Sequence, residues 1–156
     1  MTKPRAIRPR LPGKVPTTAM VMAAGLGKRM RPLTATRPKP LIHVAGKPLL
    51  DHALDHLRAA GVKRAVVNVH YLADTLEAHL ETIEGLDIEV SDERGQLLET
   101  GGGLMKARPL LGDDPIFVVN SDNFWLDGPI DALSLMADRW DPAIMDVLLL
   151  LVPLAR

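Results

Sequence analysis

The stretch Ala19-Met20-Val21-Met22-Ala23-Ala24-Gly25-Leu26-Gly27-Lys28-Arg29-Met30 passes from an apolar run into a loop rich in glycine and cations. The apolar run, residues 19–23, predicts a buried strand. Glycine lets backbone N–H groups approach a ligand closely, and a loop between a strand and a helix points those groups outward. Five basic side chains follow within a short distance, and such a cluster favours a polyphosphate ligand; they are Lys28, Arg29, Arg31, Arg37 and Lys39.

Beyond this stretch, apolar runs and helical periodicities alternate along the chain. The pattern predicts strands at 19–23, 65–69, 87–90, 116–119 and 146–152, and helices at 48–60, 72–83, 104–111 and 130–140. Such alternation predicts an α/β fold, a Rossmann-like three-layer sandwich with a mainly parallel sheet and helices on both faces. Ligands of such sheets bind beyond the carboxyl ends of the strands. The glycine loop, residues 68–71 and residues 120–122 are all expected at that edge.

Size, composition and charge narrow the classes of protein. The 156 residues, 47% of them hydrophobic, suit one folded domain over 18–156, preceded by a flexible, basic, proline-rich tail over 1–17. The tail holds five of the 19 Lys and Arg residues and no acid, so the remainder carries a net charge of −5. That charge argues against nucleic acid as a partner, and the longest apolar run, 147–152, is too short to cross a membrane. The absence of cysteine excludes disulfides and fits a cytoplasmic protein.

Two well-known phosphate-binding loops do not fit the glycine loop. The dinucleotide-binding pattern requires a third glycine where Met30 stands. The P-loop pattern requires four residues between its glycines and Ser or Thr after its lysine, but one residue separates Gly25 from Gly27 and Arg29 follows Lys28. Both patterns therefore fail on spacing, and an ordinary strand-to-helix turn stays open as the alternative to a phosphate site.

Five segments together resemble the sugar nucleotidyltransferase family, and most resemble its N-acetylmuramate 1-phosphate uridylyltransferase branch. They are Gly25–Thr34, Pro38–Leu41, Asn68–Leu72, Glu99–Gly103 and Asn120–Asp122. The resemblance implies a Mg²⁺-dependent enzyme that joins a nucleoside triphosphate to a sugar 1-phosphate and releases pyrophosphate. A phosphate substrate is already ionised at neutral pH, so positioning and charge neutralisation suffice without a strong general base.

The resemblance also implies roles for individual residues. Arg29, Lys39 and Asp122 are the expected catalytic residues, and Asp122 is the expected Mg²⁺ ligand. The expected nucleotide-binding residues are Ala23, Ala24, Gly25, Gly27, Lys28, Arg29, Asn68, Glu99, Thr100, Gly101 and Gly102. The expected contacts to the sugar phosphate come from Lys39, Gly103 and Asn120. Arg31 and Arg37 are interpreted as surface charge, and the histidines as solvated or structural residues.

Several alternatives stay open from the sequence. One is a non-catalytic nucleotide-binding or regulatory domain of the same fold, and another is a cytidylyltransferase for a different phosphate. The base is open between uracil, thymine and guanine. Members of the family are longer, with a second metal-binding aspartate and part of the sugar pocket in their later half. We therefore expect residues 18–156 to be the nucleotide-binding part, with the C-terminal portion missing, and to bind nucleotide weakly and be catalytically incomplete.

Overall fold

The computed structural model describes residues 15–151, which divide into two compact units. Pro16–Leu126 forms one unit, and Asp127 onward belongs to the other. The predicted tail lies outside the described residues up to position 14. Within the described residues, no helix combines the length and the apolar character needed to cross a lipid bilayer.

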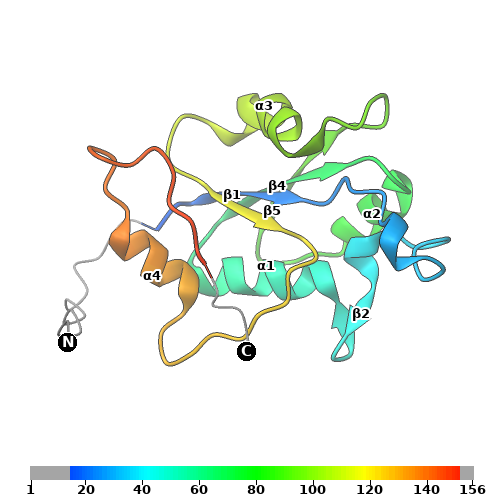
Figure 1. The fold of residues 1–156 in the computed structure, drawn as a ribbon, viewed down its shortest axis with the longest axis horizontal. Helices are drawn as coiled ribbons and strands as arrows, with labels where there is room; N and C mark the ends of the chain where they lie inside the picture. The colour runs from blue at the N-terminus through cyan, green and yellow to red at the C-terminus, as the bar shows by residue number, and fades with distance from the viewer. Residues whose placement is uncertain (1–14, 152–156) are drawn as a thin grey trace. The chain divides into compact units, whose positions relative to one another are not determined.

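A four-stranded parallel sheet forms the centre of the first unit (Figure 1). Its order is β5 (Asp87–Asp92), β4 (Arg64–Val69), β1 (Thr18–Met22) and β6 (Phe117–Asn120). In the register, Met20 lies beside Val66 on one side and Val118 on the other. The central position of β1 explains its uninterrupted apolar run, because both of its faces are covered. The structure thereby confirms four of the five predicted strands, with shifts of one or two residues at their ends.

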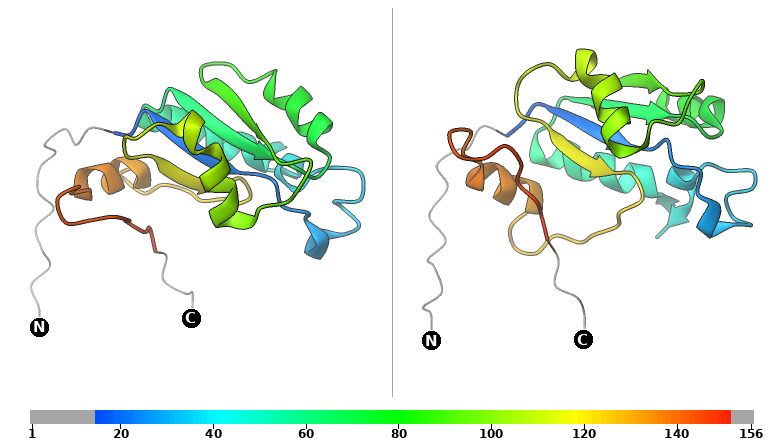
Figure 2. Two further views of the ribbon diagram at one scale, coloured as in Figure 1. Left: turned by 90° about the horizontal axis from the view of Figure 1, so that it is seen from above. Right: turned by 45° about the horizontal axis from the view of Figure 1, so that its top comes forward.

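Helices cover both faces of this sheet, as predicted (Figure 2). Helix α1 (Leu49–Ala60) lies on one face and α3 (Glu99–Leu111) on the opposite face. On the α3 face the core consists of Met20, Val66, Ala107 and Leu111. The apolar stripe of α1 buries Leu49, Leu50, Ala53, Leu54 and Leu57, and the helix ends at Gly61, which adopts a left-handed φ of 102°.

The remaining elements of this unit are short. Helix α2 spans Ala73–Leu80. Two single-turn 3₁₀ helices, η1 (Lys28–Met30) and η2 (Lys39–Leu41), follow β1. A small antiparallel hairpin, β2 (His43–Val44) and β3 (Lys47–Pro48), leads into α1. The sequence did not predict η1, η2 or the hairpin, since each is too short to show a periodicity.

Helix α3 begins earlier than the predicted 104–111 and contains the three glycines that precede the predicted helix. Glu99 stands at its start with a φ of 58°, a left-handed conformation that a non-glycine residue rarely adopts. The sequence did not predict these first turns because they contain three glycines. Glycine costs about 1 kcal/mol relative to alanine inside a helix. Pro109 lies near the end of α3, which terminates at Gly112.

The prediction of a fifth strand at 146–152 is wrong for the described residues 146–151, which form no strand. In the second unit, α4 (Ala132–Arg139) is capped by the Asp131 carboxylate, which accepts hydrogen bonds from the amides of Leu133 and Ser134. The segment beyond α4 is irregular and exposes Ile144, Val147, Leu149, Leu150 and Leu151. A strand requires a hydrogen-bonded neighbour, and no described segment pairs with this one. Val152 lies outside the described residues.

Candidate active site

A cleft of about 480 Å³ opens at the carboxyl ends of β1, β4 and β6. Its walls come from the glycine loop (residues 23–30), from η2, from the start of α3 and from the segment that ends β6. The residues of the predicted site that line it are Ala23, Ala24, Gly25, Gly27, Lys28, Arg29, Lys39, Asn68, Glu99, Thr100, Asn120 and Asp122. The fold thus brings together residues from distant parts of the sequence.

The glycine loop has a defined conformation held by Thr34. Gly27 adopts a left-handed φ of 61°, and a Cβ added to it would lie 2.8 Å from Thr34 Cγ2. Thr34 is fully buried, and its hydroxyl donates a hydrogen bond of 2.9 Å to the carbonyl of Gly27. The Tyr71 hydroxyl donates in turn to the carbonyl of Thr34 at 2.8 Å. Position 27 therefore requires glycine both for its φ and for its close contact.

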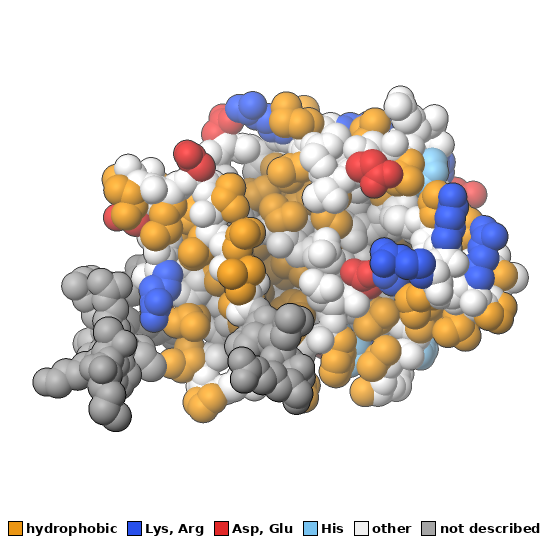
Figure 3. All heavy atoms as spheres, viewed as in Figure 1, with side chains coloured by type: hydrophobic (Ala, Val, Ile, Leu, Met, Phe, Trp, Pro, Cys, Tyr) orange, Lys and Arg blue, Asp and Glu red, His pale blue; other side chains and the backbone are white. Residues whose placement is uncertain are grey.

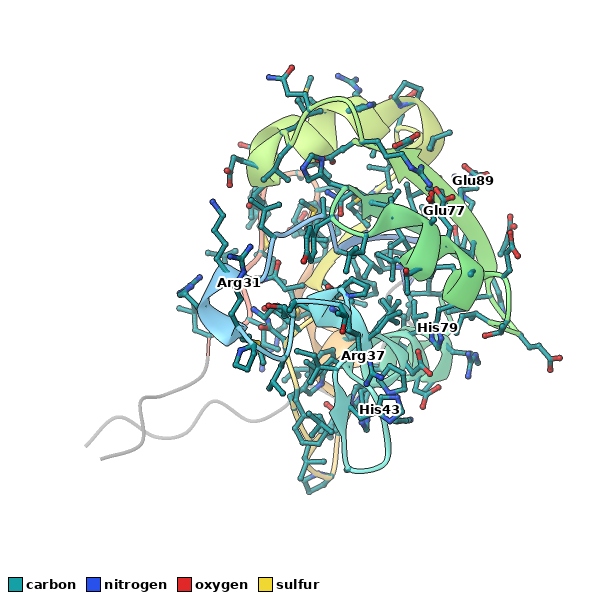
Figure 4. The ribbon with its side chains drawn as sticks, turned by 90° about the vertical axis from the view of Figure 1, so that its right-hand side faces the viewer. Arg31, Arg37, His43, Glu77, His79 and Glu89 are labelled. Atoms are coloured by element: carbon teal, nitrogen blue, oxygen red, sulfur yellow. The ribbon has the colours of Figure 1, made fainter. Side chains whose placement is uncertain are left out.

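Basic side chains surround the loop. Lys28 and Arg29 are exposed at the cleft, and no carboxylate of the described residues forms an ion pair with either. Figure 3 shows Lys and Arg side chains gathered over the segment that follows β1. Arg31 and Arg37 belong to that segment but do not line the cleft, and both are exposed (Figure 4). Their interpretation as surface charge agrees with this position.

Lys39 and Asp122 form an ion pair across the cleft. Lys39 lies in η2 between two prolines, which restrict the local backbone and hence the direction of the ammonium group. Asp122 follows the end of β6, and its side chain is 30% exposed. Beside Asp122, the hydroxyl of Ser121 donates a hydrogen bond of 2.7 Å to the carbonyl of Met22, which ties the end of β6 to the end of β1.

The described residues contain no group of three or more His, Asp or Glu side chains with the spacing of a metal site. The predicted metal ligand, Asp122, therefore belongs to no such group. A carboxylate still fits Mg²⁺, which proteins often hold through one or two carboxylates together with the phosphates of the substrate.

Two histidines of α1 hold the segment that carries Asp122. His52 contacts Phe124 edge to face, with ring centroids 4.9 Å apart. His56 stacks on Trp125 with centroids 4.1 Å apart, and its Nε2 lies 3.2 Å from the Trp125 carbonyl. The sequence alone assigned both histidines no role beyond a solvated or structural one. Their spacing of four residues, on one face of a helix, was the available signal of a shared contact.

The remaining glycines of the predicted site, Gly101, Gly102 and Gly103, do not line the cleft. Gly103 is buried, and a Cβ added to it would lie 2.7 Å from Glu93 Oε1. Glu93 itself is fully buried and accepts a hydrogen bond from the side chain of Asn68. Sequence reasoning missed Glu93, because it lies three residues beyond the predicted strand 87–90, among other polar residues.

Known proteins resemble this chain in sequence and in fold. Residues 18–153 match the family model described as nucleotidyl transferase. The chain is 56% identical over 142 residues to an N-acetylmuramate alpha-1-phosphate uridylyltransferase of Caulobacter vibrioides, a match that covers 88% of this chain and 59% of that protein. It is 48% identical over 106 residues to the protein of the same name from Neisseria meningitidis serogroup B, which covers 67% of this chain and 46% of that protein.

Among solved structures, UDP-glucose pyrophosphorylase from Acinetobacter baumannii superposes with a TM-score of 0.70. The sequence identity is 22%, and the superposition covers 79% of this chain and 52% of that one. This likeness confirms the fold, the Rossmann-like sheet with helices on both faces. The chain spans 59% or less of the length of each of these relatives.

Proposed function

Because the chain belongs to the nucleotidyl transferase family, we propose that its cleft serves the transfer of a uridylyl group from UTP to N-acetylmuramate 1-phosphate. The observation that carries the proposal is the convergence of the glycine loop, Lys39 and Asp122 on one cleft at the carboxyl edge of the sheet. The identity of the nucleotide and the sugar rests on the names of the relatives. We place the reaction in the cytoplasm, in keeping with the absence of cysteine.

In the proposed reaction, a phosphate oxygen of the sugar 1-phosphate attacks the α-phosphorus of UTP in line with the leaving group. A new phosphorus–oxygen bond forms, the bond between the α-phosphorus and the bridging oxygen breaks, and pyrophosphate leaves with the electron pair. No proton has to be removed from the attacking phosphate oxygen. The protein therefore contributes positioning and electrostatic stabilisation.

The triphosphate binds along the glycine loop, whose backbone N–H groups and cations neutralise its charge. Arg29 is free of carboxylate partners among the described residues, and its guanidinium suits the charge that develops on the departing pyrophosphate. Lys39 binds the phosphate of the sugar substrate, and Asn120 lies beside it in the cleft as a hydrogen-bonding group for the sugar.

A divalent metal, which we propose is Mg²⁺, would be held by Asp122 and would supply charge neutralisation on the phosphate oxygens. Asp122 is paired with Lys39 in the protein alone. With a metal held by Asp122, Lys39 would be available to a phosphate of the substrates.

The base of the nucleotide fits the far wall of the cleft, formed by Leu97, Glu99 and Thr100. Gly101 and Gly102 follow Thr100 in the first turns of α3 but do not line the cleft, and a Cβ added to Gly102 would lie 2.9 Å from Leu98 Cβ. Gly103 faces away from the cleft toward Glu93, and we assign it to the packing of α3.

A thermal-shift panel tests the proposal. The melting temperature of this chain is measured with UTP, CTP, GTP and dTTP, each with and without MgCl₂ and N-acetylmuramate 1-phosphate, because ligands that bind the folded state raise it. We expect the largest rise with UTP and Mg²⁺, and pyrophosphate release when the sugar phosphate is added. A rise with UTP but no pyrophosphate supports a nucleotide-binding piece, and no rise with any triphosphate contradicts the proposal.

A further inference from the structure

A chain of buried hydrogen bonds runs behind the proposed nucleotide site. Glu93, directly after β5, has no exposed surface, and Asn68 on β4 is 1% exposed. Glu93 Oε1 accepts a hydrogen bond of 2.8 Å from Asn68 Nδ2. Asn68 Oδ1 accepts one of 2.7 Å from the amide of Ala23, the first residue of the glycine loop. The carboxyl group of Glu93 is thus connected to the loop through one intermediate side chain.

The second carboxyl oxygen of Glu93 binds the segment that forms the opposite wall of the cleft. Glu93 Oε2 accepts a hydrogen bond of 3.2 Å from the amide of Leu98. Leu98 immediately precedes Glu99, whose left-handed φ of 58° opens α3. Leu97 and Glu99 on either side of it line the cleft. One side chain therefore holds the wall that carries the phosphate-binding loop and the wall that we assign to the base.

The backbone of Glu93 is equally constrained. Its amide donates to the carbonyl of Val69 at 2.8 Å, and its carbonyl lies 2.7 Å from His70 Nδ1 and accepts from the amide of Gln96 at 3.0 Å. A Cβ at Gly103 would lie 2.7 Å from Glu93 Oε1 and 2.9 Å from Asn68 Nδ2, so α3 packs directly onto the pair. These contacts fix the carboxyl group in place.

Stability alone does not account for an acid at this position. Burial of a carboxyl group costs free energy unless partners compensate it, and no Lys or Arg of the described residues pairs with Glu93. Two N–H donors, from different elements, point at its two oxygens. Only a carboxylate accepts from both, because the amide of glutamine would present an NH₂ group to one of them.

We propose that Glu93 is a positioning residue: through Asn68 and Leu98 it sets the Ala23 amide and the entry to α3, and so aligns the two walls of the nucleotide site. Glu93 does not line the cleft and acts through its neighbours. The inference rests on the proposed function for the nature of the ligand. The alignment itself is a property of the protein without ligand.

The test exchanges the donor and acceptor between positions 68 and 93. Asn68→Asp alone sets two carboxylates against each other, and Glu93→Gln alone leaves one of the two donors unmatched. In the double variant Asn68→Asp/Glu93→Gln, the new amide nitrogen at position 93 donates to the new carboxylate at position 68. The other oxygens then accept from Leu98 and Ala23 as before. Glu89→Gln is the control, since Glu89 is half-buried on β5, the strand that precedes Glu93, and pairs with Arg64.

Two measurements are made on each variant: amide hydrogen exchange at Ala23 and Leu98 without ligand, and calorimetric binding of UTP with MgCl₂. We expect each single variant to speed exchange at an affected amide and to weaken UTP binding, each by about tenfold or more, as the loss of a buried hydrogen bond predicts. We expect the double variant to recover slow amide exchange and UTP binding. We expect Glu89→Gln to match the wild-type protein in both measurements.

The proposal is overturned if the double variant is no better than the worse single variant, or if the single variants match Glu89→Gln in exchange and in binding. If a single variant does not fold, the comparison of the double variant with the wild-type protein decides. Failure of the wild-type protein to bind UTP contradicts the proposed function instead, and the exchange measurements still decide whether Glu93 positions the two walls.

Discussion

At the scale of single residues, Gly27 determines the shape of the glycine loop. Its φ of 61° disfavours any side chain, and a Cβ added there would approach Thr34 Cγ2 to 2.8 Å. We expect Gly27→Ala to lower the free energy of unfolding by about 2 kcal/mol, from the left-handed backbone and the contact together. Urea denaturation measures this loss. Gly25→Ala is the matched control, because a Cβ there meets nothing within 4 Å, and an equal loss in both variants would contradict the role of Thr34.

A substitution of Arg29 tests its proposed catalytic role without changing the stability of the protein. It is exposed at the cleft and unpaired among the described residues, so Arg29→Ala removes no ion pair of the folded protein. We expect pyrophosphate release to fall about 100-fold, as the removal of one group that stabilises a developing anion does in other enzymes, while the melting temperature stays unchanged. Arg31→Ala, an equally basic and exposed position outside the cleft, should leave both unchanged; near-normal turnover in Arg29→Ala would contradict its role.

A substitution of Asp122 distinguishes its proposed role as a metal ligand from its role in the ion pair with Lys39. Its pair with Lys39 is partly exposed on both sides, so its loss costs less than about 1 kcal/mol of stability. We expect Asp122→Asn to fold normally but to lose most of the Mg²⁺ dependence of UTP binding, which calorimetry with MgCl₂ and with EDTA measures. Asp113→Asn, at a 95% exposed carboxylate, is the control. A wild-type Mg²⁺ response in Asp122→Asn would remove Asp122 from the metal site.

The sequence motifs predicted residues that line the cleft, but they did not predict the buried residue Glu93 behind it. Arg29, Lys39 and Asp122 belong to recognisable local motifs, and each lines the cleft. Glu93 belongs to no such motif, because its role depends on donors that come from β4 and from the start of α3. Residues that act through long-range hydrogen bonds are visible only once the fold places their partners beside them.

At the scale of elements, the hairpin β2–β3 is tied to α1 by charge. Asp55 of α1 pairs with Lys47 of β3 and, at 2.9 Å, with Arg58. Partial burial works to raise the pKa of Asp55, but the hydrogen bond and charge of Lys47, together with Arg58, hold the pKa below its ordinary value of 3.8. The stability that these pairs add is therefore present above pH 3.8 and is lost as the pH falls through the lowered pKa.

Asp55→Asn should consequently reduce the free energy of unfolding at pH 7 by about 0.5 kcal/mol or less, because the Asp55 side chain is 45% exposed and solvent screens its pairs. The difference from the wild-type protein should shrink toward zero as the pH falls through the lowered pKa of Asp55. Urea denaturation at neutral pH and in acid measures both values. A difference that grows on acidification would show that the carboxylate is not held in its charged form by Lys47 and Arg58.

The end of a helix was predicted correctly where a particular residue marks it in the sequence. Gly61 ended α1 as predicted, because a left-handed φ closes a helix most easily at glycine. The start of α3 was missed because residues 101–103 are glycines, which carry no apolar period, and the packing of the helix against Glu93 and Asn68 overrides their low propensity. The contacts of α3 with Glu93 and Asn68 therefore determine where this helix begins.

At the scale of the whole chain, the sheet order places β1 between β4 and β6. Connections through α1 and α2 carry the chain outward from β1 to β4 and β5, and the return to β6 places α3 on the opposite face. The carboxyl ends of β1 and β6 then meet, and Met22 lies beside Asn120 in the register. The position of the cleft is a consequence of this reversal in strand order.

The segment 146–151 departs from the strand that its sequence predicts. A continuous apolar run of this length is compatible with a buried strand but does not require one, since pairing depends on a neighbouring strand. Amide hydrogen exchange distinguishes the two states directly. We expect the slowest exchange in β1 and β4, whose residues 19–21 and 65–67 are fully buried, and nearly unprotected exchange across 146–151. β6, at the edge of the sheet, serves as the internal reference, and protection of 146–151 equal to that of β6 would restore the fifth strand.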